Sequence, residues 1–150
     1  MQTANQFFTE QCDWFAQNKL GLITSRFAVP MAVYFGEQIM IFKNIKAIQT
    51  ALSTKRTALL NANYSRTGFR IIAESISAKK HLSLWVEFRH FDVDNHLITN
   101  STSRYFCARQ TEPHLLVQLI EYLQIPNLDA IKEQETESAT ADYQSTVAPV

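Results

Sequence analysis

The feature that most constrains the fold is a change in hydrophobic period near residue 67. Upstream, apolar residues recur at the spacing of one helix face. Downstream, apolar and polar residues alternate over three long stretches, at residues 67–77, 81–91 and 96–109. Alternation with a period of two is typical of strands that bury one face. Because helices followed by a long antiparallel sheet must pack helix on sheet, the sequence predicts an α+β fold.

Two long helices are expected in the first part of the chain. One spans residues 3–19, with Thr3 as its N-cap and Gly21 as the glycine that ends it. The other runs from its N-cap, Asn44, to residue 61. Each has an apolar stripe that would cover one face of the sheet.

The remaining segments are shorter. Residues 22–43 are expected to be extended, with a turn at Gly36-Glu37. A final short helix is expected from Pro113, which suits a first helical turn. Three apolar residues there recur at helical spacing: Leu116, Ile120 and Leu123.

The turns between the three strands predict which residues face each other. Two-residue turns at Ala78-Lys79 and Asp94-Asn95 make one face of the sheet apolar at its centre and the other partly charged. The pairs that the first turn predicts on the apolar face are Ala73 with Leu84, Ile71 with Val86, and Phe69 with Phe88. The pairs that the second turn predicts there are Leu84 with Tyr105, Val86 with Ser103, Phe88 with Ser101, and His90 with Thr99. The apolar residues that share one face are Phe69, Ile71, Leu84, Val86 and Phe88. The polar residues on one side of that face are His90, Thr99, Ser101, Ser103 and Tyr105.

The opposite face of these strands is too apolar to be fully exposed to solvent. The register places Ile72 opposite Trp85, and Trp85 opposite Arg104. An apolar centre with a charged rim is typical of interfaces between subunits. This face is therefore predicted to form a homodimer.

Composition and charge exclude several classes of protein. Fourteen basic residues balance fourteen acidic ones, so there is no net positive field to bind nucleic acid. No apolar run approaches the roughly 18 residues of a membrane-spanning helix, and the N-terminus has no signal-peptide pattern. Two cysteines without a spaced framework favour a cytoplasmic protein.

The length of 150 residues fits a single domain followed by a tail. Residues 127–150 contain five acidic residues, one basic residue and few large apolar ones. Such a segment cannot bury enough surface to offset the entropy of ordering it. The sequence predicts one domain at residues 1–126 and an acidic, disordered tail at residues 127–150.

Four short stretches carry a resemblance to a known superfamily: Phe27-Ala28-Val29-Pro30, Tyr64-Ser65-Arg66-Thr67-Gly68, Asp92-Val93-Asp94-Asn95 and Ser103-Arg104-Tyr105-Phe106. With the order of the elements, they resemble the nuclear transport factor 2-like superfamily, in its branch similar to ketosteroid isomerases and SnoaL, over about residues 3–125. The resemblance implies a cone-shaped, cystatin-like fold, with N-terminal helices on a curved, mostly antiparallel sheet. It also implies a cavity between the helices and the concave sheet, and commonly a homodimer.

The sequence departs from the steroid isomerases of that superfamily. Their chemistry needs a tyrosine on the first helix and a carboxylate soon after it. The first predicted helix has Phe7, Phe8, Trp14 and Phe15 but no tyrosine, and the first acid after it is Glu37, on a turn. This departure argues against steroid isomerase activity.

The polar cluster supplies the candidate catalytic residues. A histidine with a pKa near neutral, as expected for His90, suits proton transfer, and Tyr105 is a hydrogen-bond donor on the same face. The alternative is that His90 is a hydrogen-bonded histidine at the edge of the core. The further residues predicted to line a ligand pocket are Tyr34, Phe88, Ser101 and Ser103, and the pattern leaves open which side Tyr34 faces.

No metal and no cofactor are expected. Residues 90–96 include two histidines and two aspartates, but the register places His90 and His96 on opposite faces. Asp92 and Asp94 are better explained as turn residues. The chain has three glycines and no phosphate loop, dinucleotide fingerprint or nucleophile motif.

Three functions are consistent with these features. The first is binding of a small, largely apolar or cyclic molecule in a cavity between the helices and the concave sheet. The second is an isomerase, cyclase or dehydratase that uses His90 as base and Tyr105 as donor. The third is a dimeric interaction module that acts through the outer sheet face and the acidic tail.

Overall fold

A computed structural model describes residues 2–77, 80–109 and 113–124. These residues form three helices and six strands: α1 (Ala4–Ala16), α2 (Leu20–Thr24), β1 (Phe27–Phe35), β2 (Gln38–Phe42), α3 (Ile45–Leu60), β3 (Tyr64–Ile76), β4 (His81–Asp92), β5 (Leu97–Arg109) and β6 (Leu115–Gln124). The predicted tail at residues 127–150 lies outside the described residues.

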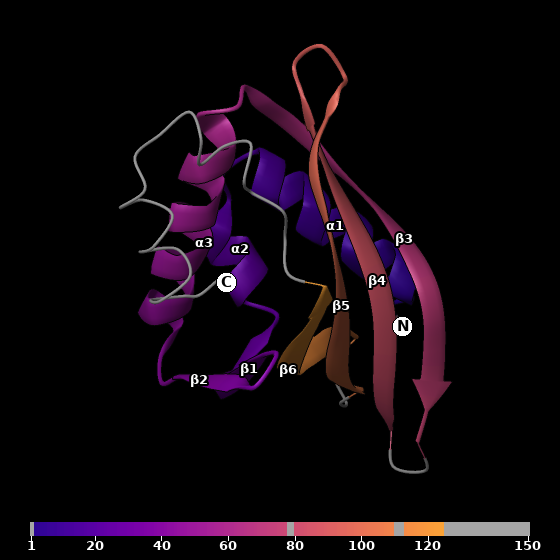
Figure 1. The fold of residues 1–150 in the computed structure, drawn as a ribbon. Helices are drawn as coiled ribbons and strands as arrows, with labels where there is room; N and C mark the ends of the chain where they lie inside the picture. Colours follow the sequence, from indigo (N-terminus) through magenta and orange to yellow (C-terminus); the bar gives the residue numbers. More distant parts are fainter. Residues whose placement is uncertain (1, 78–79, 110–112, 125–150) are drawn as a thin grey trace.

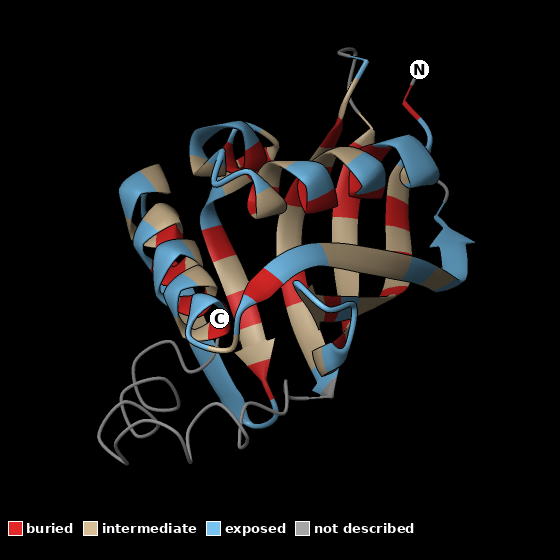
Figure 2. Cartoon of the chain, turned by 90° about the horizontal axis from the view of Figure 1, so that it is seen from above, coloured by how far each residue is buried: buried red, intermediate tan, exposed pale blue. Residues whose placement is uncertain are grey.

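The six strands form one curved sheet in the order β2-β1-β6-β5-β4-β3 (Figure 1). β1 and β6 run parallel, and the other neighbours run antiparallel. Seen from above, α1 crosses the concave side of the sheet, and the buried residues gather between them (Figure 2). The predicted α+β fold, with helices on a curved and mostly antiparallel sheet, is confirmed.

The first helix is shorter than predicted. A capping box between Thr3 and Gln6 starts α1, as the sequence suggested, but the helix ends at Ala16. The chain turns at Asn18, whose φ of 59° is in the left-handed region that asparagine tolerates. Gly21 therefore does not end α1 and instead lies within α2.

The second predicted helix is confirmed. The Asn44 side chain accepts a hydrogen bond from the backbone N–H of Ala47 and caps α3. The segment predicted to be extended from residue 22 begins as a strand only at Phe27, because α2 occupies the residues before it. Within the described residues, no helix has the length and apolar character needed to cross a membrane.

The segment after Pro113 is a strand, and the prediction of a helix there is wrong. β6 lies between β1 and β5 in the sheet. Its pairing with β5 shifts between Val117 and Leu119, which leaves Gln118 as the extra residue of a β-bulge. Because of the bulge, the buried residues Val117 and Ile120 are three positions apart instead of two. A separation of three matches a helical period, but of the predicted helical stripe only Ile120 is buried.

The register of the central strands is largely as predicted. The predicted pairs that the structure contains are Phe69 with Phe88, Ile71 with Val86, Leu84 with Tyr105, Val86 with Ser103, Phe88 with Ser101, His90 with Thr99, and Trp85 with Arg104. Near the β3–β4 turn the prediction is wrong, because Ala73 faces Trp85 instead of Leu84. Ile72 is the extra residue of a bulge there, so it has no direct partner across the ladder.

The predicted apolar face packs against α1. Phe8 is fully buried, and its ring lies 5.6 Å from that of Phe69, 5.8 Å from that of Phe88 and 5.2 Å from that of Tyr105, measured between ring centroids. Edge and tilted ring contacts of this kind add to the free energy that burial itself provides. α1 is thereby held against β3, β4 and β5.

Candidate functional site

A pocket of about 70 Å³ lies between the concave face of the sheet and the helices α1 and α3. Its wall is mostly apolar and includes Phe15, Met31, Val33, Leu52, Phe88 and Ile120. The polar side chains that line it are Gln11, Cys12, Lys55, Thr67, His90, Tyr105 and Tyr122. A largely apolar wall with a few polar groups is the usual character of a small-molecule site.

His90 extends from β4 into this pocket and is 3% exposed. Its Nδ1 atom lies 2.8 Å from the hydroxyl oxygen of Thr67, which in turn is hydrogen bonded to Tyr64. Its Nε2 atom is buried without a hydrogen-bond partner among the described residues. Burial, and then the nearby charge of Lys55, lower the pKa of His90 well below its usual range, so the ring is neutral at pH 7.

Tyr105 lines the same pocket from β5. Burial is the main reason that the pKa of Tyr105 is well above its usual range, and the nearby Tyr122 hydroxyl raises it further. The phenol therefore keeps its proton at any physiological pH. Within the described part of the chain, no hydrogen bond joins Tyr105 to His90, so the two residues share a pocket without forming a pair.

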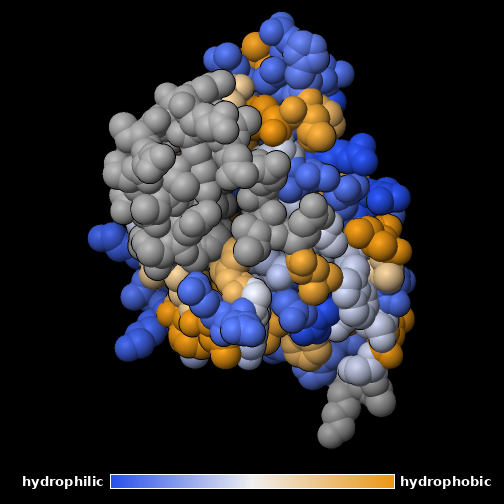
Figure 3. All heavy atoms as spheres, in the orientation of Figure 1, coloured by the Kyte–Doolittle hydropathy of each residue, from blue (hydrophilic) through white to orange (hydrophobic). Residues whose placement is uncertain are grey.

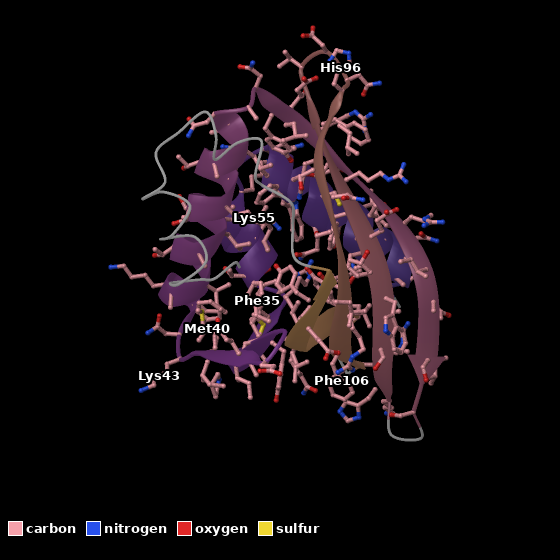
Figure 4. The ribbon with its side chains drawn as sticks, in the orientation of Figure 1. Phe35, Met40, Lys43, Lys55, His96 and Phe106 are labelled. Atoms are coloured by element: carbon pink, nitrogen blue, oxygen red, sulfur yellow. The ribbon has the colours of Figure 1, made fainter. Side chains whose placement is uncertain are left out.

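Lys55 is a functional candidate that the sequence patterns did not identify. It lies on α3, points toward the sheet (Figure 4) and is 8% exposed. Its Nζ atom lies 6.0 Å from the ring centroids of both Phe15 and Tyr122. Burial lowers the pKa of Lys55 to about 8, and the nearby Cys12 thiol opposes this change.

The spacing of residues along one face of α3 could have identified Lys55. Its buried residues are Ile48, Ala51, Lys55 and Leu59, at intervals of three and four positions. The predicted stripe contained apolar residues alone and so passed over the lysine. The next residue, Arg56, donates hydrogen bonds from Nε to the carbonyl oxygen of Phe15 and from Nη2 to that of Ala16. These bonds provide partners for two carbonyl groups in the last turn of α1.

Comparison with known proteins identifies the fold. No protein-family model and no curated protein matches the chain. Among solved structures, Aln2 from a Streptomyces species is 11% identical with a TM-score of 0.63, over 87% of this chain and 92% of its own. A nuclear transport factor 2-like protein with a cystatin-like fold from Novosphingobium aromaticivorans is 9% identical with a TM-score of 0.62, over 91% and 83%.

The chain has the nuclear transport factor 2-like fold. A domain of unknown function with a cystatin-like fold from Nostoc punctiforme agrees, at 11% identity and a TM-score of 0.61 over 95% of this chain and 90% of its own. Because these identities are low, the likeness concerns the fold alone, and function must be argued from the pocket.

In this nuclear transport factor 2-like fold, the predicted site residues are only partly brought together. His90, Tyr105 and Phe88 line the pocket. Ser101 and Ser103 are buried on the same strand as Tyr105 but are not among the lining residues, and their hydroxyls have no partner among the described residues. Tyr34 is not a lining residue either, because its neighbour Val33 faces the pocket and successive strand residues point to opposite faces.

The segment at residues 90–96 is a hairpin in which the aspartates serve the turn. The Asp92 carboxylate accepts hydrogen bonds from the backbone N–H groups of Asp94 and His96, at 2.9 and 2.8 Å. His96 lies at the exposed tip of this hairpin (Figure 4). No group of three or more His, Cys, Asp and Glu side chains gathers in the described ranges.

A buried neutral histidine should make the protein sensitive to acid. Between pH 6.5 and the lower pKa of folded His90, the unfolded chain binds a proton that the folded protein does not, so stability falls with falling pH. We expect His90→Asn to reduce this loss by roughly 1.4 kcal/mol per pH unit in that range. Urea unfolding at several pH values measures the effect. The wild type is the reference, and an equal slope in His90→Asn and the wild type would contradict the buried neutral state.

Proposed function

We propose that the protein binds a small, largely apolar molecule in the pocket between α1, α3 and the concave sheet. The observation that carries this proposal is the wall itself, which combines apolar side chains from the helices and the sheet with a few polar groups. Both Lys55 and His90 are among those polar groups and are nearly fully buried. Polar groups placed in this way fix the orientation of a ligand.

The size of the pocket limits the ligand. Pockets that bind drug-sized molecules have volumes of roughly 300–1,000 Å³, whereas this pocket has about 70 Å³. A compact molecule of a few heavy atoms fits without rearrangement. A larger one requires movement of side chains at the wall, of which Met31 is the most adaptable.

Filling the pocket should abolish binding. Leu52 lines the pocket from α3, whereas the next residue, Ser53, is exposed. Leu52→Trp should therefore block the space, and Ser53→Trp should leave it open. Native mass spectrometry of protein purified from its own host detects a retained molecule, and thermal shifts with added compounds measure its affinity. Retention of the same molecule by Leu52→Trp would show that the ligand site lies elsewhere.

A second candidate function is catalysis of the isomerase, cyclase or dehydratase type, because His90 and Tyr105 both line the pocket. The pKa of His90 is well below its usual range, however, and a weaker base is less effective at taking a proton at neutral pH. The lowered pKa of His90, and the lack of a hydrogen bond between His90 and Tyr105 in the described part of the chain, thus favour binding. Turnover of cyclic ketones or hydroxy-substituted compounds that is lost in His90→Asn, with binding retained, would favour the enzyme instead.

It stays a prediction that the protein forms a homodimer through the outer sheet face. The same holds for its role as an interaction module and for its cytoplasmic location. Ile72 is 50% exposed on the outer sheet face, Trp85 is partly buried beside it, and Arg104 forms an ion pair with Glu121 at 3.0 Å. On the side of the molecule shown in Figure 3, apolar residues form separate patches among hydrophilic ones. The subunit number seen in the same native mass spectra tests the dimer, and a monomer would remove the argument for this face.

A further inference from the structure

The pocket contains a buried cation that no acidic side chain balances. Lys55 is the one formally charged residue among the described residues that line the pocket, and none of those residues is Asp or Glu. No salt bridge to Lys55 is formed within the described ranges. Transfer of an ammonium group from water into such a site is costly unless a partner compensates for it.

The neighbouring elements do not supply the missing charge. α1 contributes Gln11 and Cys12 to the wall, and burial raises the pKa of that thiol to about 12, so it remains neutral. β4 contributes His90, which is neutral, and β6 contributes Tyr122, whose pKa burial raises above its usual range. The nearest acid along β6, Glu121, is engaged by Arg104 at 3.0 Å.

A second buried polar atom lines the same pocket. The Nε2 atom of His90 has no hydrogen-bond partner among the described residues, although Nδ1 is engaged by Thr67. Lys55 and the Nε2 atom of His90 thus line one small pocket without an ion-pair or hydrogen-bond partner among the described residues, and a polar group of a bound molecule would supply one.

We propose that the molecule held in this pocket is a compact carboxylic acid, whose carboxylate pairs with Lys55 Nζ and whose apolar body packs against the surrounding wall. A carboxylate oxygen accepts a charge-assisted hydrogen bond from an ammonium group, the stronger kind of hydrogen bond in proteins. The proposal rests on the ligand-binding function proposed above and adds the chemical class of the ligand. The pocket volume of about 70 Å³ restricts that class to small acids.

The test compares each acid with its neutral amide of nearly the same shape. The probes are isovalerate with isovaleramide, hexanoate with hexanamide, and benzoate with benzamide, measured by titration calorimetry at pH 7. The proteins are the wild type, Lys55→Met, and Lys46→Met as a control at an exposed position on the same helix. Lys55→Met keeps the length of the side chain and removes a buried charge, so it is expected to fold.

We expect at least one acid to bind the wild type about tenfold more tightly than its amide, which corresponds to about 1.4 kcal/mol. Lys46→Met should keep this preference, and Lys55→Met should lose it. A second measurement does not depend on affinity. Because the pKa of Lys55 is about 8, binding of an acid at pH 8 should draw protons from the buffer in the wild type and none in Lys55→Met.

The outcomes separate this proposal from the binding function. If acids and amides bind the wild type equally and Leu52→Trp abolishes both, the pocket binds neutral molecules and the carboxylate proposal is wrong. If the preference for the acid persists in Lys55→Met, the lysine is not its cause. If neither class binds at millimolar concentration, both the carboxylate proposal and the binding of compact molecules are overturned.

Discussion

Replacement of Lys55 by methionine should raise the free energy of unfolding by about 3 kcal/mol at pH 7. Burial lowers the pKa of this lysine from 10.5 to about 8. Because one pKa unit corresponds to about 1.4 kcal/mol, the folded protein disfavours the charged form by about 3 kcal/mol relative to the unfolded chain. Methionine has a similar length and no charge, so it occupies the same apolar surroundings without that cost.

The difference between the two proteins should depend on pH. Below pH 8, Lys55 is protonated in both the folded and unfolded states, and the full destabilisation is present. Between pH 8 and 10.5 the folded protein has released this proton and the unfolded chain still holds it, so the stability of the wild type rises relative to the variant. The gap should therefore be constant below pH 8 and close as the pH approaches 10.5.

Urea unfolding of both proteins from pH 7 to pH 10 measures this gap. Other buried groups with raised pKa values, such as Tyr64 and Cys107, lower the stability at high pH. They are common to both proteins, so their effect cancels in the difference. Lys46→Met, at an exposed site, should match the wild type throughout. A Lys55→Met protein that is less stable than the wild type, or a gap that does not change with pH, would contradict the uncompensated burial of Lys55.

A stability gain of this size has a functional meaning. A residue whose removal stabilises the fold is not explained by folding, and strongly perturbed groups in a pocket are candidates for function. If the gain is measured, Lys55 is such a residue, and it is the one polar side chain that α3 contributes to the described wall of the pocket. The stability measurement therefore tests the cost of burying the charge of Lys55. The acid–amide comparison tests whether a carboxylate ligand offsets that cost.

The sequence predicted best where local patterns and neighbouring strands agreed. The β4–β5 hairpin is the example, because alternation and turn residues gave one register that placed His90 and Tyr105 on the concave face. The structure contains that register as far as His90, and it shifts by one residue next to the turn. Prediction was weaker where an extra residue interrupts the alternation. The bulge at Ile72 shifted the pairs near the β3–β4 turn, and nothing in its side chain indicates a bulge.

Only part of the candidate site was predicted, because alternation within a strand does not show how other elements pack on it. A strand pattern identifies the face on which a side chain lies, so His90, Phe88 and Tyr105 were placed in the pocket. It does not show where helices cover that face, so Ser101 and Ser103 were assigned to the pocket although they are not among its lining residues. Lys55 was missed because a charged residue is normally exposed, and its burial depends on packing between distant elements.

Two substitutions in β6 should separate the strand from the helix that the sequence suggested. In the helical interpretation, Leu123 belongs to the buried stripe, whereas in the structure it is 50% exposed and Val117 is fully buried between β1 and β5. Leu123→Asp should thus cost less than about 1 kcal/mol, because surface changes are usually small. Val117→Asp should cost at least about 4 kcal/mol, because it buries a carboxylate without a partner.

A loss of that size approaches the whole stability of a typical domain, so Val117→Asp should be largely unfolded at 25 °C. Its far-UV circular dichroism and its urea midpoint, compared with those of Leu123→Asp, measure the difference between the two sites. The two substitutions add the same charge to the same strand, so each is the control for the other. The reverse ranking, with Leu123→Asp unfolded and Val117→Asp stable, would show that this segment is not the inner strand of the sheet. β6 supplies Ile120 and Tyr122 to the pocket, so the same result would also remove one wall of the proposed ligand site.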